Sequence, residues 1–296
     1  MSFKLIDGKA VALKVRLELQ AEITKAIKQG IRPPGLAAIL VGHDGASETY
    51  VASKVKACGL AGIHSKLIRF DEDVSEKLLL ETVQALNFDT SIDGFIVQLP
   101  LPKHINEQKI IEAILPEKDV DGFHPVNVGN LALGLPGFVS ATPKGIMMLL
   151  KAHNINTTGK HAVVIGRSRI VGMPTSLLLA QNTNPGNCTV TLCHSKTNDL
   201  TSIVKQADII IAALGKPRFV TENMVKDGAV VIDVGITRIE NKESAKGYEI
   251  VGDVDFENVA PKCSFITPVP GGVGAMTIAA LLSNTVLSWQ QKSKYA

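Results

Sequence analysis

A tyrosine and a lysine four residues apart are the first side chains in this sequence that could do acid–base chemistry. Tyr50 and Lys54 belong to the segment YVASK, and in a helix this spacing puts both side chains on one face. A lysine whose pKa is lowered can take and return protons near neutral pH. A lone helical lysine is more simply a solvated charge, as we expect for Lys56 and Lys66. Lys54 is therefore a candidate only if other polar groups accompany it.

Two later segments supply that company. Gln98 stands near the carboxyl end of the predicted strand in DGFIVQLPLP, where open α/β sheets bind ligands. Its neutral amide could orient a lysine without adding charge. The segment KDVDG, which starts at Lys118, adds two carboxylates at the entry of a long central segment. We therefore predict an acid–base site around Lys54.

A second candidate is a phosphate-binding loop. The segment GRSRIVG, Gly166 to Gly172, follows a predicted strand and precedes a predicted helix. Backbone N–H groups at a helix N-terminus can face a phosphate there, and glycine lets the backbone approach it. The spacing departs from G-x-G-x-x-G, because Ser168 replaces the middle glycine and Gly172 comes one place late. An ordinary strand-to-helix turn is the alternative.

The end of the next predicted strand indicates which dinucleotide would bind. An NAD site usually has Asp or Glu there for the ribose 2′-hydroxyl, but LCHSKT contains no acid. Ser195, Lys196 and Arg167 could instead bind a 2′-phosphate, whose geometry suits arginine. The pattern favours NADP over NAD. A solvated surface role for Lys196 explains that residue equally well.

The order of the motifs along the chain distinguishes this site from that of the short-chain dehydrogenases. The spacing of Tyr50 and Lys54 is that of the catalytic pair in short-chain dehydrogenases, where the pair follows the nucleotide loop and the tyrosine is the acid. Here the pair precedes the loop at Gly166. We therefore predict that Lys54 is the acid–base group and that Tyr50 positions it.

The elements that must position these residues alternate between strand and helix along two stretches, which predicts α/β units with mostly parallel sheets. The first stretch has expected helices at 8–30, 47–62, 75–87 and 106–114, and expected strands at 36–42, 65–70 and 93–102. The second, Rossmann-like stretch has expected strands at 161–167, 188–195, 208–215 and 229–235, helices at 173–181, 199–207 and 222–228, a strand or loop from 265, and a terminal helix.

Two connecting segments have their own predictions. Residues 118–137 are rich in Gly, Pro, Asp and Asn and are interpreted as a long irregular segment, which in a compact protein tends to be functional. Residues 142–154 are predicted to form a helix that could bridge two domains. Thr142 is placed to cap that helix, and Pro143 lies in its first turn.

Bulk properties exclude several classes of protein. The chain has 296 residues, 45% of them hydrophobic, and a net charge of +3 with no long charged block, so we expect about two domains and neither nucleic-acid nor membrane binding. The four cysteines form no C-x-x-C pair, and no His/Cys/Asp metal cluster is evident. Each of the seven histidines is more simply a surface or structural residue, although His124 and His194 lie in motifs and could touch a ligand. We expect a cytoplasmic protein without a signal peptide.

In this order the motifs resemble those of a known family over nearly the whole chain. YVASK, DGFIVQLPLP, KDVDGFHPVNVG, TPKG, VVIGRSRIVGMP, CHSKT, IDVG, GDVDF and TPVPGGVGAMT are similar to the bifunctional methylenetetrahydrofolate dehydrogenase/methenyltetrahydrofolate cyclohydrolases, known in bacteria as FolD. Each motif alone is weak, and the full set in register is specific. Ala141 and Ala275 stand where many members have Cys and Pro.

The resemblance implies two α/β domains, the second a Rossmann-like NADP-binding domain, with an interdomain active-site cleft. The folate-binding catalytic domain would comprise 1–143 and 276–296, and the NADP-binding domain 144–275. The implied reaction oxidises 5,10-methylenetetrahydrofolate with NADP+ and then hydrolyses the methenyl product to 10-formyltetrahydrofolate. It also implies a homodimer, tetrahydrofolate derivatives as ligands, no metal, and a place in one-carbon metabolism supplying purine, methionine and histidine biosynthesis.

Site residues follow from the matching motif positions. The implied catalytic residues are Lys54, Gln98, Tyr50 and Asp121. The implied folate-binding residues are these four together with Val97, Leu99, Pro270, Gly271 and Gly272. The implied cofactor-binding residues are Gly166, Arg167, Ser168, Ile170, Val171, Ser195, Ile236 and Thr277.

Three alternatives stay open at this point. One is another two-domain enzyme with a C-terminal Rossmann unit, such as a shikimate dehydrogenase. Another is a catalytically dead sensor that binds NADP or folate. The third is a dehydrogenase that lacks the hydrolase activity.

Overall fold

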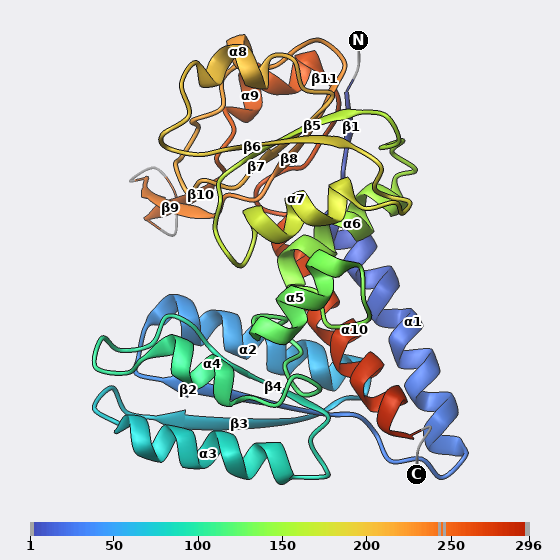
Figure 1. Ribbon diagram of the computed structural model, residues 1–296, viewed down its shortest axis with the longest axis vertical. Helices are drawn as coiled ribbons and strands as arrows, with labels where there is room; N and C mark the ends of the chain where they lie inside the picture. Colours follow the sequence, from blue (N-terminus) through green and yellow to red (C-terminus); the bar gives the residue numbers. More distant parts are fainter. Residues whose placement is uncertain (1–2, 242–243, 245–246, 294–296) are drawn as a thin grey trace. The chain divides into compact units, whose positions relative to one another are not determined.

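The computed structural model describes residues 3–241, 244 and 247–293, and the chain divides into two compact units. The three-stranded unit comprises Leu13–Ala141 and Ile278–Ala296. The six-stranded unit comprises Met1–Ala12 and Thr142–Thr277. Each unit is built on a mostly parallel sheet and is described by itself (Figure 1).

The three-stranded unit is centred on β2 (Gly35–Val41), which is buried along its whole length. It pairs in parallel with β3 (His64–Phe70) on one side and β4 (Gly94–Val97) on the other. A strand covered on both faces needs a continuous apolar sequence, and GLAAILV provides it. The predicted strands and their parallel arrangement are confirmed here.

Helices pack around this sheet and begin and end at recognisable signals. They are α2 (Gly45–Ala61), α3 (Glu76–Phe88) and α4 (Glu107–Ala113). Ser75 caps α3 by accepting the Leu78 N–H at 3.2 Å, as predicted. Asp44 caps α2 in the same way, and Gly62 ends that helix in the left-handed conformation that glycine adopts readily.

The interpretation of 118–137 as irregular was wrong for its middle part. Residues Pro125–Leu133 form helix α5. The imidazole of His124 accepts the Val126 N–H, Pro125 occupies the first turn, and Gly134 terminates the helix with φ 69°. Each of these is a helix-end signal, and together they offset the abundance of Gly and Asn between them.

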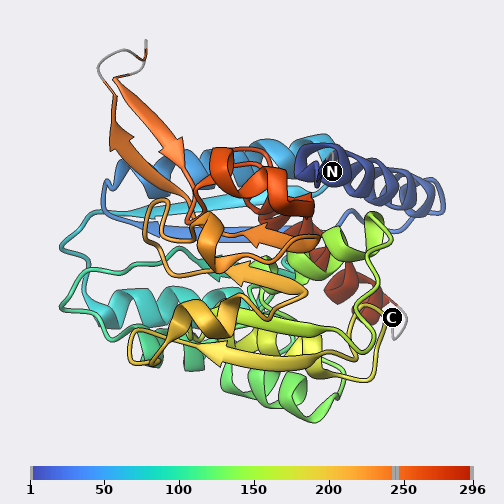
Figure 2. The same cartoon turned by 90° about the horizontal axis from the view of Figure 1, so that it is seen from above.

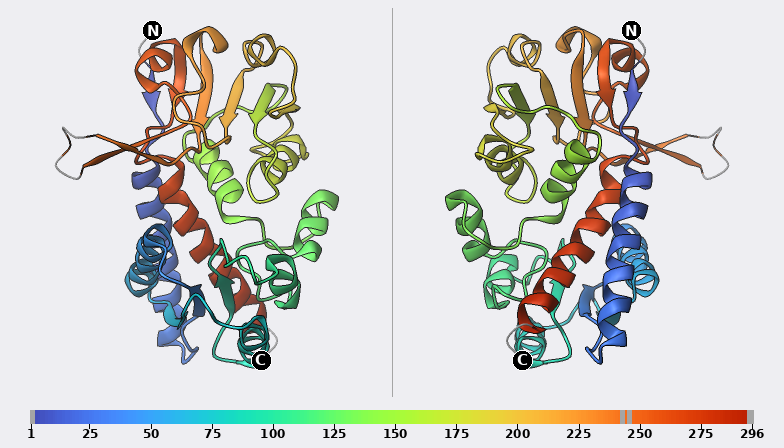
Figure 3. Two further views of the ribbon diagram at one scale, coloured as in Figure 1. Left: turned by 90° about the vertical axis from the view of Figure 1, so that its left-hand side faces the viewer. Right: turned by 90° about the vertical axis from the view of Figure 1, so that its right-hand side faces the viewer.

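The long helix α10 (Val273–Ser293) contributes its second half to the three-stranded unit, where Gln290 donates a side-chain hydrogen bond to Glu22 of α1 (Gly8–Lys28). Figure 3 shows both helices. The polar side chains of α10 satisfy backbone carbonyls of neighbouring segments. Trp289 Nε1 donates to Arg32 O at 3.0 Å. Asn284 Nδ2 donates to Val120 O at 2.8 Å and to Val139 O at 2.9 Å. The bond from Asn284 to Val120 O fixes the segment that carries Asp121.

The six-stranded unit has the strand order β1-β11-β8-β7-β5-β6, with every pair parallel. The strands are β1 (Lys4–Leu5), β5 (His161–Ile165), β6 (Thr189–Cys193), β7 (Ile209–Ala212), β8 (Ala229–Asp233) and β11 (Cys263–Ile266). After β5 the chain goes to one side for β6 and to the other for β7. The carboxyl ends of β5 and β7 therefore form a topological switch point.

The compact units differ from the predicted domain bounds at the start of the chain. Strand β1 pairs in parallel with β11, so the first 12 residues belong to the six-stranded unit. The later boundaries lie at 141/142 and 277/278, within two residues of the predicted ones. The helix predicted at 142–154 is α6 (Ala141–Ala152). Thr142 lies inside this helix, so its predicted capping role was wrong.

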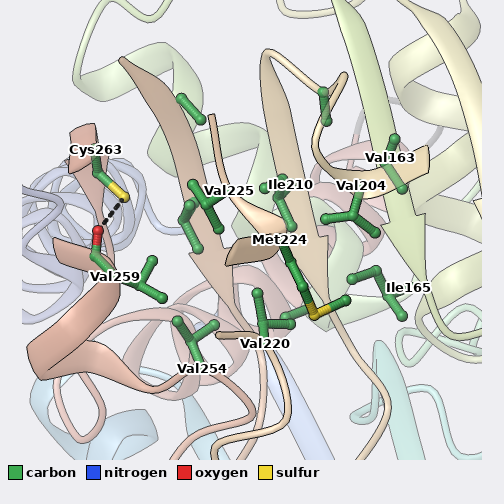
Figure 4. Packing of buried hydrophobic residues seen from close by; sticks show 14 of the residues in the cluster. Val163, Ile165, Val204, Ile210, Val220, Met224, Val225, Val254, Val259 and Cys263 are labelled. Atoms are coloured by element: carbon green, nitrogen blue, oxygen red, sulfur yellow. Dashed lines mark hydrogen bonds between the residues drawn. The ribbon is translucent and has the colours of Figure 1, made fainter. Parts of the chain in front are cut away.

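Short helices complete the six-stranded unit around an apolar core. They are α7 (Gly172–Ala180), α8 (Leu200–Val204), α9 (Phe256–Val259), and the 3₁₀ turns η1 (Glu222–Met224) and η2 (Ala260–Lys262). Figure 4 shows Ile210, Val220 and Met224 packed together beneath the strands. In the same core the Cys263 thiol donates to Val259 O.

A two-stranded antiparallel ribbon was not predicted. Strands β9 (Thr237–Glu240) and β10 (Tyr248–Val251) pair with each other and project from the six-stranded unit (Figure 2). Arg238 stacks on the Tyr248 ring at 4.9 Å across the ribbon. Among the described residues, no helix is long and apolar enough to cross a bilayer, and no cluster of three His, Cys, Asp or Glu side chains could hold a metal ion.

The contacts of Asn284 give a stability prediction. The Asn284→Ala variant leaves the buried Val120 carbonyl and the partly buried Val139 carbonyl without their donor, and loss of a buried donor costs about 1–3 kcal/mol. We expect a decrease of about 2 kcal/mol or more in the unfolding free energy, seen as a lower urea midpoint. The exposed Gln291 on the same helix is the control, and Gln291→Ala should change the value by less than about 0.5 kcal/mol. Equal midpoints for the two variants would contradict the assignment.

Candidate active site and nucleotide pocket

Three of the predicted catalytic side chains meet around the Lys54 ammonium in the three-stranded unit. Lys54 lies on α2 and is only 5% exposed. Its Nζ donates a 3.1 Å hydrogen bond to Gln98 Oε1 and lies 4.5 Å from the centre of the Tyr50 ring. A cation over an aromatic face is attracted to it. Lys54 is thus held by a neutral amide and an aromatic ring.

Backbone geometry decides which amide atom of Gln98 faces the lysine. The pairing of β4 with β2 continues one residue past Val97, because the Gln98 N–H donates to Ile39 O at 2.9 Å. The side-chain Nε2 then donates to Leu99 O at 2.9 Å. With the NH₂ group occupied in this way, the oxygen points at Lys54. The acceptor is fixed by the carboxyl end of the strand.

Burial controls the protonation of this cluster. Removal from water disfavours the charged form of Lys54 and lowers its pKa, while Asp121 and Cys58 partly oppose that shift. Burial also raises the pKa of Asp121, which Lys54 opposes. Burial raises the pKa of the Cys58 thiol to about 12, so this neighbour is a neutral thiol at pH 7. Lys54 can therefore release its proton more readily than a solvated lysine.

The sequence reasoning gave no role to Asp119, the first carboxylate of KDVDG. This carboxylate is buried and accepts three hydrogen bonds, from Gly122 N at 3.1 Å, His124 N at 2.8 Å and Asn127 Nδ2 at 2.8 Å. Burial raises its pKa to about 6, with these bonds opposing the shift. Asp119 thus holds the turn that presents Asp121. Asp followed three residues later by Gly is the signal for such a turn.

The predicted phosphate loop borders a pocket of about 280 Å³ in the six-stranded unit. The pocket lies at the carboxyl ends of the paired strands β5 and β7, from which the chain continues to opposite sides of the sheet order, at the switch point. Gly166, Arg167, Ser168 and Ser195 line it, as predicted from the sequence. Residues from the end of β7 and beyond also line it and were not predicted: Ala213, Leu214, Lys216 and Phe219.

Two glycines make the loop tight enough to form this pocket. Gly166 has φ 121°, and a Cβ there would lie 2.0 Å from Ala213 O. A Cβ on Gly172 would lie 1.8 Å from Gly166 O. Ser168, at the position of the missing middle glycine, accepts the N–H groups of Val171 and Gly172 through its hydroxyl at 3.2 and 3.3 Å. The departure from G-x-G-x-x-G therefore supplies a side-chain cap for α7.

The remaining predicted cofactor residues do not line this pocket. Ile170 and Ile236 are exposed, and Val171 immediately precedes α7. The Thr277 hydroxyl lies 3.2 Å from the Thr142 hydroxyl. Of these four, Val171 is linked to the pocket through its N–H bond to Ser168, and none of the four lines the pocket itself.

The predicted folate-binding residues fall into two groups. Six belong to the three-stranded unit: Tyr50, Lys54, Val97, Gln98, Leu99 and Asp121. Pro270, Gly271 and Gly272 belong to the six-stranded unit. There, Gly271 O accepts the Lys9 N–H at 3.1 Å, and a Cβ on Gly272 would lie 2.6 Å from Pro268 O. This second group forms a close-packed turn against the start of α1.

Comparison with known proteins identifies the family to which the chain belongs. The model described as "Tetrahydrofolate dehydrogenase/cyclohydrolase, catalytic domain" matches residues 6–121, and the one described as the "NAD(P)-binding domain" of the same enzymes matches residues 140–293. The fold and pocket thus define a two-domain α/β enzyme with an NAD(P)-binding domain. The chain belongs to the tetrahydrofolate dehydrogenase/cyclohydrolase family.

Individual relatives cover nearly the whole chain. The "Bifunctional protein FolD" of Porphyromonas gingivalis is 59% identical over 287 residues, or 97% of each chain. That of Bacteroides thetaiotaomicron is 60% identical over 284 residues, covering 96% of this chain and 97% of the relative. The predicted family is confirmed, and the alternative that the chain is a shikimate dehydrogenase is excluded.

Solved structures agree with this assignment. The bifunctional FolD enzyme of Campylobacter jejuni is 49% identical with a TM-score of 0.92, over 98% of this chain and 100% of that one. Trypanosoma brucei FolD, solved with NADP cofactor and inhibitor, is 37% identical with a TM-score of 0.93, over 99% of both chains. The predicted fold class of two α/β domains, one of them NAD(P)-binding, is confirmed.

The loop geometry predicts a specific effect of substitution at Gly166. In Gly166→Ala the new methyl group meets the Ala213 carbonyl, so the loop must shift, and we expect NADP+ affinity to fall about tenfold or more. Gly159→Ala is a matched control, because Gly159 also has a positive φ, of 71°, but has open space around it. Fluorescence titration measures both affinities. Equal losses in the two variants would mean that the close approach at Gly166 is irrelevant to binding.

Proposed function

We propose that the protein oxidises 5,10-methylenetetrahydrofolate to 5,10-methenyltetrahydrofolate with NADP+ and then hydrolyses the product to 10-formyltetrahydrofolate. In this proposal the three-stranded unit binds the folate, and the six-stranded unit binds the dinucleotide. The observation that carries the proposal is the buried Lys54, bonded to Gln98 in a chain of this family. This cluster fits the hydrolytic step.

Hydrolysis of a methenyl carbon needs one group to take a proton and later return one. A water molecule must lose a proton as it adds to the cationic carbon, and the departing ring nitrogen must gain one. Lys54 can do both, because burial lowers its pKa toward the working range. Gln98 keeps Nζ in place without adding charge, and the Tyr50 ring supports the ammonium form.

For the oxidation step the protein need not supply a strong acid or base, but it must position the folate and the dinucleotide against each other. The substrate's own nitrogen lone pair assists loss of the hydride, so no strong acid is needed, and positioning supplies the rate. NADP+, when bound, supplies the hydride acceptor. We propose that Asp121 holds the pterin amino group, that Val97 and Leu99 contact the folate, and that Pro270, Gly271 and Gly272 form a folate-facing turn.

The choice of NADP over NAD rests on charge at the nucleotide pocket. Arg167, Ser195 and Lys216 line it, and no carboxylate side chain does so within the described part of the chain. Guanidinium and ammonium groups favour a 2′-phosphate. We further propose that Ile170, Val171, Ile236 and Thr277 contact the dinucleotide, and that the protein is a cytoplasmic homodimer, as the family resemblance implies.

A spectrophotometric assay tests the function directly. Methylenetetrahydrofolate with NADP+ should produce the methenyl absorbance, which should then decay. The Lys54→Met variant should form the methenyl product without hydrolysing it beyond the spontaneous rate. Absence of methenyl product with either dinucleotide would refute the dehydrogenase and would favour a catalytically dead sensor. Formation without decay in the wild-type chain would identify a dehydrogenase lacking the hydrolase activity.

The environment of Lys54 predicts two opposite pH shifts. The cyclohydrolase rate should rise with pH as Lys54 becomes neutral and able to accept a proton. Gln98→Glu puts an anion in the place of the amide oxygen, raises the pKa of Lys54, and should move this rise about one unit higher in pH. Gln98→Leu removes the acceptor and should move it lower. Unchanged profiles in both variants would exclude Lys54 as the titrating base.

The nucleotide preference is tested at the phosphate loop. Arg167→Ala should raise the KM for NADP+ about tenfold and leave that for NAD+ nearly unchanged, because one charged contact to phosphate is lost. Arg169→Ala is the control, since Arg169 is exposed in the same loop but does not line the pocket. Equal effects of Arg167→Ala on both dinucleotides would place recognition of the 2′-phosphate elsewhere.

A further inference from the structure

The three-stranded unit has a pocket at the edge of its sheet opposite to Gln98. It has a volume of about 580 Å³. Arg32 precedes β2 and Ile92 precedes β4, so the pocket lies at the amino ends of these strands, whereas Gln98 follows the carboxyl end of β4. The last turn of α10 reaches the same edge through Lys292 (Figure 1). The pocket is therefore separate from the Lys54 cluster.

Three cations and three apolar side chains define this basic pocket: Arg32, Lys118, Lys292, Ile31, Phe88 and Ile92. The guanidinium of Arg32 is fully engaged at its two terminal nitrogens. It binds both carboxylate oxygens of the buried Asp93, at 2.7 and 2.8 Å, and also donates to Pro33 O and Thr90 O. Arg32 thus serves mainly to hold Asp93.

The two lysines keep donors that these contacts do not use. Lys118 Nζ donates to Leu86 O at 2.7 Å and Asp89 O at 2.8 Å, and Lys292 Nζ donates to Asp93 O at 2.9 Å. An ammonium group has three N–H donors. Within the described residues, one N–H of Lys118 and two of Lys292 therefore have no protein acceptor. All the acceptors in use are backbone carbonyls, so neither ammonium has a carboxylate bonded to it.

Burial and neighbouring charges both act on the two lysines of the basic pocket. Burial lowers the pKa of Lys292 to about 8, and repulsion from Lys118 and Arg32 adds to the shift, while Asp93 and Glu117 oppose it. Burial likewise lowers the pKa of Lys118. Arg32 adds to the lowering of the Lys118 pKa, while Asp89, Asp93 and Glu117 oppose it. The charge of Lys118 thus disfavours the charged form of Lys292. An anion placed between them would remove that cost.

The other wall of the pocket is apolar and open to solvent. Phe88, the last residue of α3, is 79% exposed, and Ile31 is 37% exposed. Binding pockets combine apolar walls with a few converging polar groups, and a volume of about 300–1,000 Å³ is typical. The pocket offers a ligand two ammonium groups on one side and hydrocarbon on the other.

We propose that the basic pocket binds a small oxyanion, a carboxylate or a phosphate monoester, that carries an apolar group. Lys118 and Lys292 bind the oxyanion through their remaining N–H groups, and Phe88 and Ile31 cover the apolar group. Asp93 occupies the guanidinium fork of Arg32, so bidentate recognition is not available to the ligand. Lysines act as point charges, and both kinds of oxyanion satisfy them.

Phenyl phosphate and benzoate are suitable probes, observed by amide NMR of the full ¹⁵N-labelled chain with saturating NADP+ to fill the nucleotide pocket. We expect saturable shifts for the amides of 88–92 and 117–118 with at least one of the probes. Lys292→Gln should weaken that binding about tenfold, Lys292→Arg should retain most of it, and Phe88→Ser should weaken it about threefold. Lys77→Gln, an exposed lysine on α3, should have no effect.

Two further measurements test separately the contribution of the apolar group and oxyanion of the ligand and that of the charge on Lys292. Inorganic phosphate and benzyl alcohol should each bind more weakly than phenyl phosphate, because each lacks one half of the ligand. Binding of phenyl phosphate should weaken between pH 7 and pH 9, as Lys292, with a pKa of about 8, loses its charge. Absence of shifts at 88–92 and 117–118 at about 10 mM of both probes, or binding that Lys292→Gln leaves unchanged, would overturn the proposal. Because the readout is residue-specific, this result is independent of catalytic activity.

Discussion

The burial of a lysine against a neutral amide is the interaction on which the candidate active site depends. An ammonium group removed from water is costly unless it is paired or loses its proton. At Lys54 the hydrogen-bonded partner is the oxygen of Gln98, while Asp121 acts only through its charge. A carboxylate in the place of Gln98 would raise the pKa of Lys54 and favour its charged form. The amide keeps both protonation states accessible, which a group that must both take and return a proton requires.

That arrangement uses most of the packing of the three-stranded unit. The oxygen of Gln98 faces Lys54 because the pairing of β2 with β4 runs one residue beyond Val97. Asp121 is presented by a turn that Asp119 closes and that Asn284 of α10 holds through Val120 O. The geometry of the candidate site is therefore supported by Asp119 and Asn284, which lie outside the Lys54 cluster. In the six-stranded unit the comparable constraint is steric, because the approach of Gly166 to the end of β7 leaves no room for a Cβ.

Structural features that depend on neighbouring residues in the sequence could be predicted. Features that depend on pairing between segments far apart in the sequence could not. The strands, the Ser75 cap and the cluster of Tyr50, Lys54 and Gln98 followed from apolar runs and spacing. The two-residue β1 was missed because its pairing with β11 joins segments more than 250 residues apart. Lys216 and Phe219 were missed because only the strand order reveals that β7 ends beside β5. Helix α5 had local signals, and its Gly and Asn content hid them.

The spacing of Tyr50 and Lys54 shows why a motif needs its environment before it can be assigned a mechanism. Four residues on a helix guarantee a shared face and leave open which side chain transfers the proton. Here the ring lies under the ammonium, and the hydrogen bond of the ammonium goes to Gln98. Burial then lowers the pKa of the lysine, which makes Lys54 the better candidate of the two for exchanging a proton. Gln98, at the end of the strand that faces the helix, therefore distinguishes the two side chains of the pair.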